Sequence, residues 1–157
     1  MIPFAPEELI SQIEYIEQAY YRLILVVAPS GSGKTAFLKK IQYQLNIPYL
    51  NINLELSRKL INLSHQEKKL QTRMILEDIL DTFSDQIAIL DNIEMLFASE
   101  LALDPLQLLK TLSRNRTLVV AWSGYIKDNY LIYAEPNHPE YRKEPIDDIY
   151  IVSFENA

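Results

Sequence analysis

The chain has 157 residues, enough for one domain with its own hydrophobic core, and its lack of cysteine excludes disulfides and thiolate metal sites. Fifteen Lys and Arg against twenty-one Asp and Glu give a formal net charge of −6, so no bulk electrostatic attraction draws it to nucleic acid or an anionic membrane surface. No apolar run approaches the roughly 20 residues of a membrane-spanning helix, so we expect a cytoplasmic protein that makes no membrane contact and meets nucleic acid only indirectly or through partners.

The N-terminal third of the chain alternates helical and strand patterns. Its first eight residues lack the basic lead of a signal peptide. Apolar residues recur at three- and four-residue spacing over 6–21, which predicts an amphipathic helix with Pro and two Glu in its first turn. The aliphatic run 22–28 is typical of a strand buried on both faces, whereas 34–45 return to helical spacing. Residues 47–54 alternate as a further strand.

The remainder of the chain continues this alternation. Helical spacing covers 64–83, and its apolar side includes Leu70 and Met74. Asp104 and the proline after it are typical of a helix N-terminus, here a helix that runs through residue 112. Three further strands are expected at residues 86–90, 117–122 and 148–154. The segment 124–146 is rich in Tyr and Pro, and we expect it to begin with a short helix and to continue as a loop.

Alternating strands and helices predict an α/β fold of three layers, a five-stranded parallel sheet with helices on both faces. The sequence contains no repeat, no low-complexity tract and no composition shift that marks a domain boundary. We therefore expect a single domain over residues 1–157, with an N-terminal helix within 1–21 and a nucleotide-binding core over 22–157.

A glycine-rich turn between the first strand and the next helix carries the strongest motif. Residues 28–35 read APSGSGKT and match the Walker A pattern from its second glycine onward, with Ala28 in place of the first. The glycines allow backbone N–H groups to face an anion, and the following helix adds its positive end. Lys34 is expected to reach the β- and γ-phosphates, and the Thr35 hydroxyl to bind magnesium. The pattern predicts a site for ATP or a similar nucleoside triphosphate with Mg²⁺, formed by Pro29, Ser30, Gly31, Ser32, Gly33, Lys34 and Thr35.

An apolar strand that ends in Asp91 is typical of the Walker B motif, whose carboxylate would hold the magnesium beside Thr35. Many ATPases place Glu directly after this Asp, and here Asn92 stands in that position. Glu94 is a candidate general base if the chain turns helical at once, and it could equally be a solvated glutamate of a first helical turn. The sequence therefore predicts binding of the nucleotide and leaves hydrolysis open.

Two further side chains are candidates for contacts with the terminal phosphate. Ser123 follows the strand 117–122, where related ATPases keep a polar residue, although serine is also a common turn residue. Arg142 is the first candidate for a charge-stabilising arginine that reaches a neighbouring subunit, with Arg114 and Arg116 as alternatives, and any of them could be an ordinary surface charge. The two histidines, His65 and His138, have no partners at metal-ligand spacing.

Together the motifs PSGSGKT, IAILDNIE and VVAWSG resemble the ASCE class of P-loop ATPases and are similar to AAA+ proteins from Arg22 onward. This resemblance implies a strand order of 5-1-4-3-2, and the expected fold lacks the C-terminal helical lid of many AAA+ proteins. The segments LILVVAPSGSGKT and IAILDNIEML also resemble the BrxF family, small P-loop proteins of bacterial BREX phage-defence systems. That resemblance implies a homo-oligomer or a subunit of a multiprotein defence complex with a methyltransferase, a phosphatase-like protein and a larger ATPase.

Three functions follow as hypotheses. The first is an ATPase or ATP-gated subunit of a defence complex. The second is a nucleotide-dependent switch or scaffold with little turnover, which Asn92 favours. A small-molecule kinase is the least favoured, because 124–146 offers only Lys127, Arg142 and Lys143 as basic residues for a substrate lid. Neither the D-x-x-G nor the N-K-x-D motif of GTPases is present.

Overall fold

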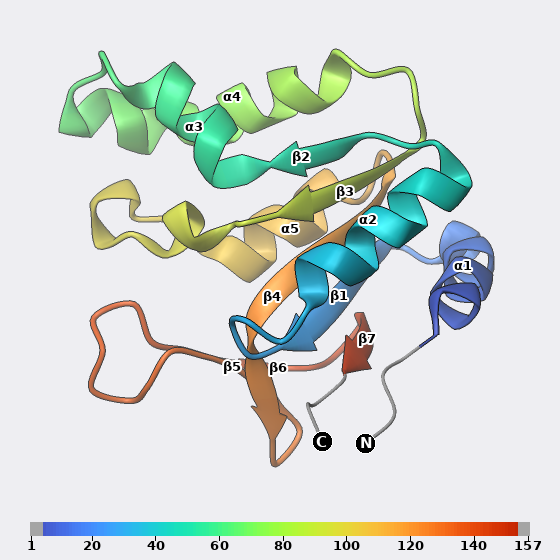
Figure 1. Cartoon of the computed structure of the whole chain (residues 1–157). Coiled ribbons are helices and arrows are strands. Elements are labelled where there is room, and N and C mark those ends of the chain that lie inside the picture. Colours follow the sequence, from blue (N-terminus) through green and yellow to red (C-terminus); the bar gives the residue numbers. More distant parts are fainter. Residues whose placement is uncertain (1–4, 154–157) are drawn as a thin grey trace.

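A seven-stranded sheet organises residues 5–153, the part of the chain that the computed structural model describes (Figure 1). Its five parallel strands lie in the order β2-β3-β4-β1-β7. A β-ribbon continues from β4, which pairs antiparallel with β5, and β5 pairs with β6. The strands are β1 (Leu23–Ala28), β2 (Tyr49–Asn51), β3 (Ile87–Asp91), β4 (Thr117–Lys127), β5 (Tyr130–Tyr133), β6 (Arg142–Pro145) and β7 (Tyr150–Ser153).

Helices cover both faces of the parallel strands (Figure 1). The helices are α1 (Pro6–Tyr15), α2 (Lys34–Leu45), α3 (Ile52–Leu60), α4 (His65–Asp81) and α5 (Pro105–Leu112), with short 3-10 helices η1 (Ile16–Gln18), η2 (Glu94–Phe97) and η3 (Ser99–Leu101). Alternate residues of β1 point to opposite faces, so Leu25 packs with α3, α4 and α5, and Val26 packs with α1 and α2. All six residues of β1 are buried, which explains its unbroken aliphatic sequence.

Side-chain caps explain where several helices begin. Asn51 accepts a hydrogen bond from Leu54 N at 3.1 Å, and α3 therefore starts directly after β2. Ser64 and Glu67 form a reciprocal capping box at the start of α4. Asp104 caps α5 as expected from its position before Pro105.

The structure corrects three expectations in the N-terminal half. The strand expected over 47–54 comprises only Tyr49–Asn51, because the Asn51 cap starts α3 at Ile52. The helix expected over 6–21 ends at Tyr15 and is followed by η1. The apolar side expected for α4 was wrong at Leu70 and Met74, which are 82% and 52% exposed, while Leu76, Ile79 and Leu80 face the core.

The short helix expected at the start of 124–146 was wrong, and the expected loop is limited mainly to residues 134–141, between β5 and β6. β4 runs on to Lys127, and Asp128 and Asn129 then turn the chain with φ of 52° and 65°, the left-handed conformation of tight hairpin turns. Trp122 Nε1 donates a hydrogen bond to Ile132 O at 3.1 Å, which fastens β5 across the end of the core. Gly124 is needed at this crossing, since a Cβ atom there would lie 2.0 Å from the same carbonyl oxygen.

The expected class, an α/β fold with a parallel sheet, is confirmed. The order β7-β1-β4-β3-β2 is compatible with the expected order 5-1-4-3-2, but the sheet has seven strands because β5 and β6 extend it. Position 154 of the last expected strand lies outside the described residues. Within residues 5–153, no helix has the length and apolar character required to cross a membrane.

Candidate functional site

A cavity of about 210 Å³ lies at the carboxyl ends of β1 and β3, beside Ser123 within β4. Because β4 pairs in parallel with both β1 and β3, the segments that follow β1 and β3 meet beside Ser123, where the pairing of β1 with β4 ends. The cavity is lined by Ser30, Gly31, Gly33, Lys34, Thr35, Asp91, Asn92, Glu94 and Ser123. The structure therefore brings together most of the residues that the motifs single out, from three separate parts of the chain.

The backbone of the glycine-rich turn has the conformation that explains its composition. Gly31 and Gly33 have φ of 78° and 98°, a backbone conformation that residues with a Cβ atom rarely adopt. A Cβ built on either glycine would meet no other atom of the described residues within 4 Å, so the space beside both is open. Gly33 is also the N-cap of α2, whose N-terminus faces this space. Ser32 contributes a buried Oγ that has no hydrogen-bond partner within residues 5–153.

Lys34 is buried, with 6% of its surface exposed, although it lines the cavity. Its Nζ donates hydrogen bonds to Ala28 O at 2.8 Å and to Pro29 O at 2.9 Å. Burial lowers the pKa of Lys34, and the nearby carboxylates of Asp91 and Glu94 partly counteract that effect. The ammonium group is thus held at the base of the loop by the loop's own carbonyls.

Asp91 is 3% exposed, and both of its carboxylate oxygens accept hydrogen bonds. Thr35 Oγ1 donates to Oδ2 at 2.7 Å, and the Asn92 N–H donates to Oδ1 at 2.9 Å. Tyr49 adds a third bond from its hydroxyl to Oδ2. Burial, followed by this bond to Asp91, raises the pKa of Tyr49. A threonine hydroxyl beside a buried carboxylate is a donor set that fits Mg²⁺, which commonly uses few protein ligands.

Glu94 reaches the cavity because Asn92 turns the chain with φ of 53° and η2 begins two residues later. Glu94 Oε2 accepts a hydrogen bond from Asn53 Nδ2 at 3.3 Å. Asn53 also accepts from Met95 N at 2.9 Å, and its own N–H donates to Asn92 O at 2.8 Å. Three bonds from one residue of α3 therefore hold the segment that carries Glu94. The role of Glu94 as a base stays a prediction.

Sequence reasoning did not single out Tyr49 and Asn53. Tyr49 is the first residue of the short strand β2, and Asn53 lies two residues beyond its end, in α3. The strand pairs with β3 in a register that sets Asn51 opposite Asp91. The available signal was the group of polar and aromatic residues around the expected strand. The hydrogen-bond partners of Tyr49 and Asn53, Asp91 and Glu94, lie more than 40 residues away in the chain. The β2–β3 pairing brings Tyr49 to Asp91, and the start of α3 brings Asn53 to the segment of Glu94.

Ser123 lies in register with Ala28 and faces the phosphate loop across the β1–β4 pair. Arg142 does not line the cavity: it lies in β6 and its Nη2 donates to Leu103 O at 2.7 Å. Arg114 stacks on the Tyr20 ring at 3.9 Å, and Arg116 donates to Leu80 O. That any of these arginines stabilises charge in the site of a neighbouring subunit stays a prediction.

The histidines also have local partners. His65 lies 3.2 Å from Glu100, and His138 Nδ1 accepts from Glu140 N. Within residues 5–153, no group of three or more His, Cys, Asp or Glu side chains could hold a metal ion.

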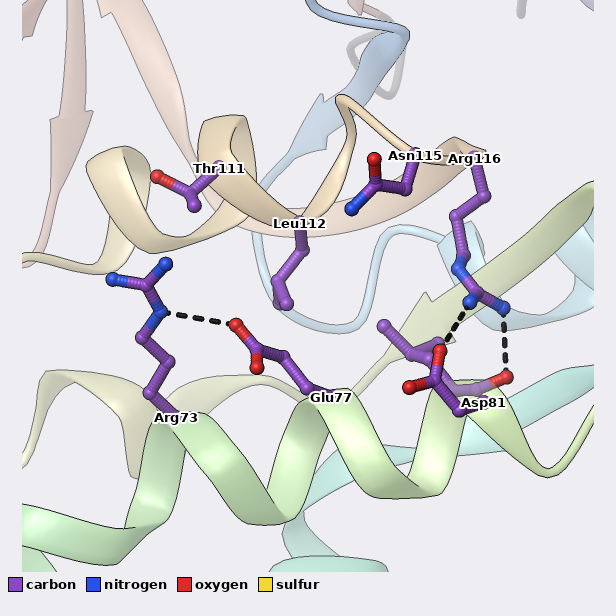
Figure 2. A pocket seen from close by; sticks show the side chains of 8 residues that line it. Arg73, Glu77, Asp81, Thr111, Leu112, Asn115 and Arg116 are labelled. Carbon is purple, nitrogen blue, oxygen red and sulfur yellow. Dashed lines mark hydrogen bonds and ion pairs between the residues drawn. The ribbon is translucent and has the colours of Figure 1, made fainter.

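A second pocket of about 170 Å³ lies between α4 and α5, near the amino end of β4 (Figure 2). Its charged side chains are paired with one another. Arg73 Nε lies 3.1 Å from Glu77, and Arg116 Nη2 lies 2.7 Å from Asp81. Because its charges neutralise each other, we place the candidate site at the glycine-rich loop instead.

Comparisons with known proteins leave the family open. No protein-family model matches the sequence, and no curated protein matches it. Among solved structures, the chain is similar to that of C. elegans PCH-2, with a TM-score of 0.48 and 15% sequence identity. The match covers 96% of this chain and 43% of that chain, so this chain spans less than half of its length. A likeness at this level carries no functional assignment.

Proposed function

We propose that this chain binds ATP or a similar nucleoside triphosphate with Mg²⁺ at the glycine-rich loop, and that it acts as an ATPase or as an ATP-gated subunit. The observation that carries the proposal is the 2.7 Å hydrogen bond between Thr35 and the buried carboxylate of Asp91, at the end of a loop built on two glycines with positive φ. A chance Gly-Ser turn before a helix would not bring a buried strand-end aspartate to the first turn of that helix.

The triphosphate is held by residues 29–35 in this proposal. Open space beside Gly31 and Gly33 permits close approach of an anion to the backbone N–H groups, and the N-terminus of α2 adds a favourable field. Lys34 supplies positive charge from a buried position, where an anion is attracted more strongly than in bulk water. The unpartnered Oγ of Ser32 is a further polar group within the loop.

Thr35 and Asp91 would hold the magnesium ion. When bound, Mg²⁺ neutralises charge on the phosphate oxygens and orients the terminal phosphoryl group. Asp91 contributes a carboxylate whose orientation is set by three donors. Because the Asp91 carboxylate is already oriented, little free energy is needed to reorient it when the metal binds.

Hydrolysis would draw on two more residues of the cavity. Glu94 is the candidate acceptor for the proton of an attacking water molecule, and Asn53 orients its carboxylate. Ser123 would donate a hydrogen bond to the terminal phosphate. Arg142 would act on the site of a neighbouring copy, the arrangement in which homo-oligomers complete such a site. Participation in a BREX defence complex rests on the sequence resemblance alone.

A nucleotide-dependent switch or scaffold with little turnover is the second candidate. It is supported by Asn92, which stands directly after Asp91 where many ATPases have glutamate and donates its N–H to that carboxylate. In this version the nucleotide stabilises one conformation of the chain, and catalytic groups come from a partner.

The test measures affinity for a fluorescent ATP analogue and Mg²⁺-dependent turnover over a range of protein concentrations. Lys34→Ala is expected to weaken binding at least tenfold, whereas Lys40→Ala, which removes an exposed lysine from the same helix, leaves it unchanged. Turnover that rises with concentration and is lost in Glu94→Gln supports an assembling ATPase. Binding without turnover at any concentration supports the switch, and a wild-type chain that binds no nucleotide refutes both.

A further inference from the structure

We propose that Tyr49 is a positioning residue for the magnesium ligand Asp91: its hydroxyl holds the carboxylate in the orientation that the metal requires. This inference rests on the proposed function of the site. It assigns a role in metal affinity to a side chain that lies outside the Walker motifs and does not line the cavity.

The pairing of β2 with β3 places Tyr49 within reach of Asp91. Tyr49 lies opposite Ile89, and Asn51 lies opposite Asp91. Residues two apart in a strand share a face, so the side chains of Tyr49 and Asp91 both project to the side of the sheet that α2 covers. Tyr49 packs against the core cluster of α1 and α2, with Ile89 and Phe37 among its members. Its phenol therefore extends along the sheet, and the hydroxyl reaches Oδ2 of Asp91.

Lys39 of α2 also contacts the aromatic ring of Tyr49. Lys39 Nζ lies 5.3 Å from the ring centroid, a distance at which the cation is attracted to the aromatic face. Lys39 follows Thr35 by four residues on α2, so both side chains occupy the same face of that helix. One helix thus supplies a donor to Asp91 directly and steadies the second donor through its ring.

The two donors to Oδ2 of Asp91, Thr35 and Tyr49, differ in whether they also bind the metal in the proposed site. The Thr35 hydroxyl is itself a magnesium ligand there, so its position changes with the metal. The Tyr49 hydroxyl has no such second task and can stay with Asp91 in both states. A carboxylate that is 3% exposed needs its acceptor sites filled, because an unsatisfied buried charge is costly. Tyr49 is therefore the contact that keeps Oδ2 in place when the metal binds and leaves, while the Asn92 N–H holds Oδ1.

The experiment compares Tyr49→Phe with Tyr43→Phe, in which the same hydroxyl is removed from a tyrosine of α2 that is 89% exposed. Binding of a fluorescent ATP analogue is titrated with Mg²⁺ at fixed nucleotide, and the metal-free affinity is measured in chelator. We expect Tyr49→Phe to raise the Mg²⁺ concentration at half-saturation about tenfold. Its metal-free affinity is expected to stay at the wild-type value, and Tyr43→Phe is expected to change neither quantity.

A Tyr49→Phe protein with the wild-type Mg²⁺ half-saturation would overturn the inference. Equal weakening with and without metal would also overturn it, because it would indicate a general structural role. Tyr49→Leu provides the same test if the phenylalanine variant does not fold, as judged by circular dichroism. Failure of the proposed function looks different: the wild-type chain itself would then bind no nucleotide or show no dependence on Mg²⁺.

Discussion

Replacement of Gly124 by alanine tests the packing of β4 against β5, directly after Ser123 of the cavity. The new Cβ would lie 2.0 Å from Ile132 O and 2.9 Å from Trp122 Nε1. The carbonyl belongs to the β4–β5 ladder, so the clash is relieved only if those strands move apart. Such movement breaks the Trp122–Ile132 hydrogen bond, a loss of about 1 kcal/mol. Overpacking adds about 1–3 kcal/mol, and the expected loss in the free energy of unfolding is about 2–4 kcal/mol.

The assay is urea unfolding followed by tryptophan fluorescence, since Trp122 is the one tryptophan of the chain and lies at the clash. Gly31→Ala is the comparison: its φ is 78°, but an added Cβ meets no described atom within 4 Å, so only backbone strain of about 1–2 kcal/mol is expected. An unfolding midpoint for Gly124→Ala at or above that of Gly31→Ala would refute the argument from steric contact.

Three further predictions concern single side chains. Asn53→Ala removes the amide bond to Glu94, so turnover is expected to fall while ATP-analogue affinity stays unchanged; equal losses of both would contradict a role in orienting Glu94. Arg116→Met removes bonds to Leu80 O and Asp81 from a side chain that is 13% exposed, and thermal unfolding should show a loss of about 1–2 kcal/mol. Arg73→Met, whose ion pair is exposed, is the control and should lose less than about 0.5 kcal/mol. Burial, and then the charge of Asp104, raises the pKa of Glu144, so the stability that its proton provides is present below the ordinary pKa of 4.5 and lost as the pH rises through the folded-state value. Glu144→Gln should therefore unfold at a higher temperature than wild type at pH 7, and the difference should shrink toward pH 4; a difference that does not change with pH would contradict this assignment.

The parts of the fold that sequence reasoning identified are those with strong local patterns. β1 is an unbroken aliphatic run because both of its faces are covered, and the glycines of the phosphate loop mark a backbone that needs positive φ. The pairing of Thr35 with Asp91 was predictable because two motifs with fixed spacing imply it. Each of these features is predicted from motifs of a few consecutive residues, although the two motifs that pair Thr35 with Asp91 lie far apart in the chain.

The features that escaped prediction depend on contacts between distant residues or on competition between local signals. The alternation over 47–54 suggests a strand, yet the cap from Asn51 favours a helix, and the helix prevails. Tyr49 and Asn53 acquire their roles only through partners on β3 and η2. The β-ribbon was missed because its turn uses Asp128 and Asn129 instead of glycine.

The short edge strand β2 has a kinetic consequence for the site. It comprises three residues and pairs with β3 alone, so few backbone bonds hold it at the border of the sheet. Local opening of such a border costs much less free energy than global unfolding. One opening event would withdraw Tyr49 from Asp91 and Asn53 from Glu94 together. Amide hydrogen exchange at residues 49–53 would then measure how often the site loses these two contacts. A bound nucleotide would slow that exchange.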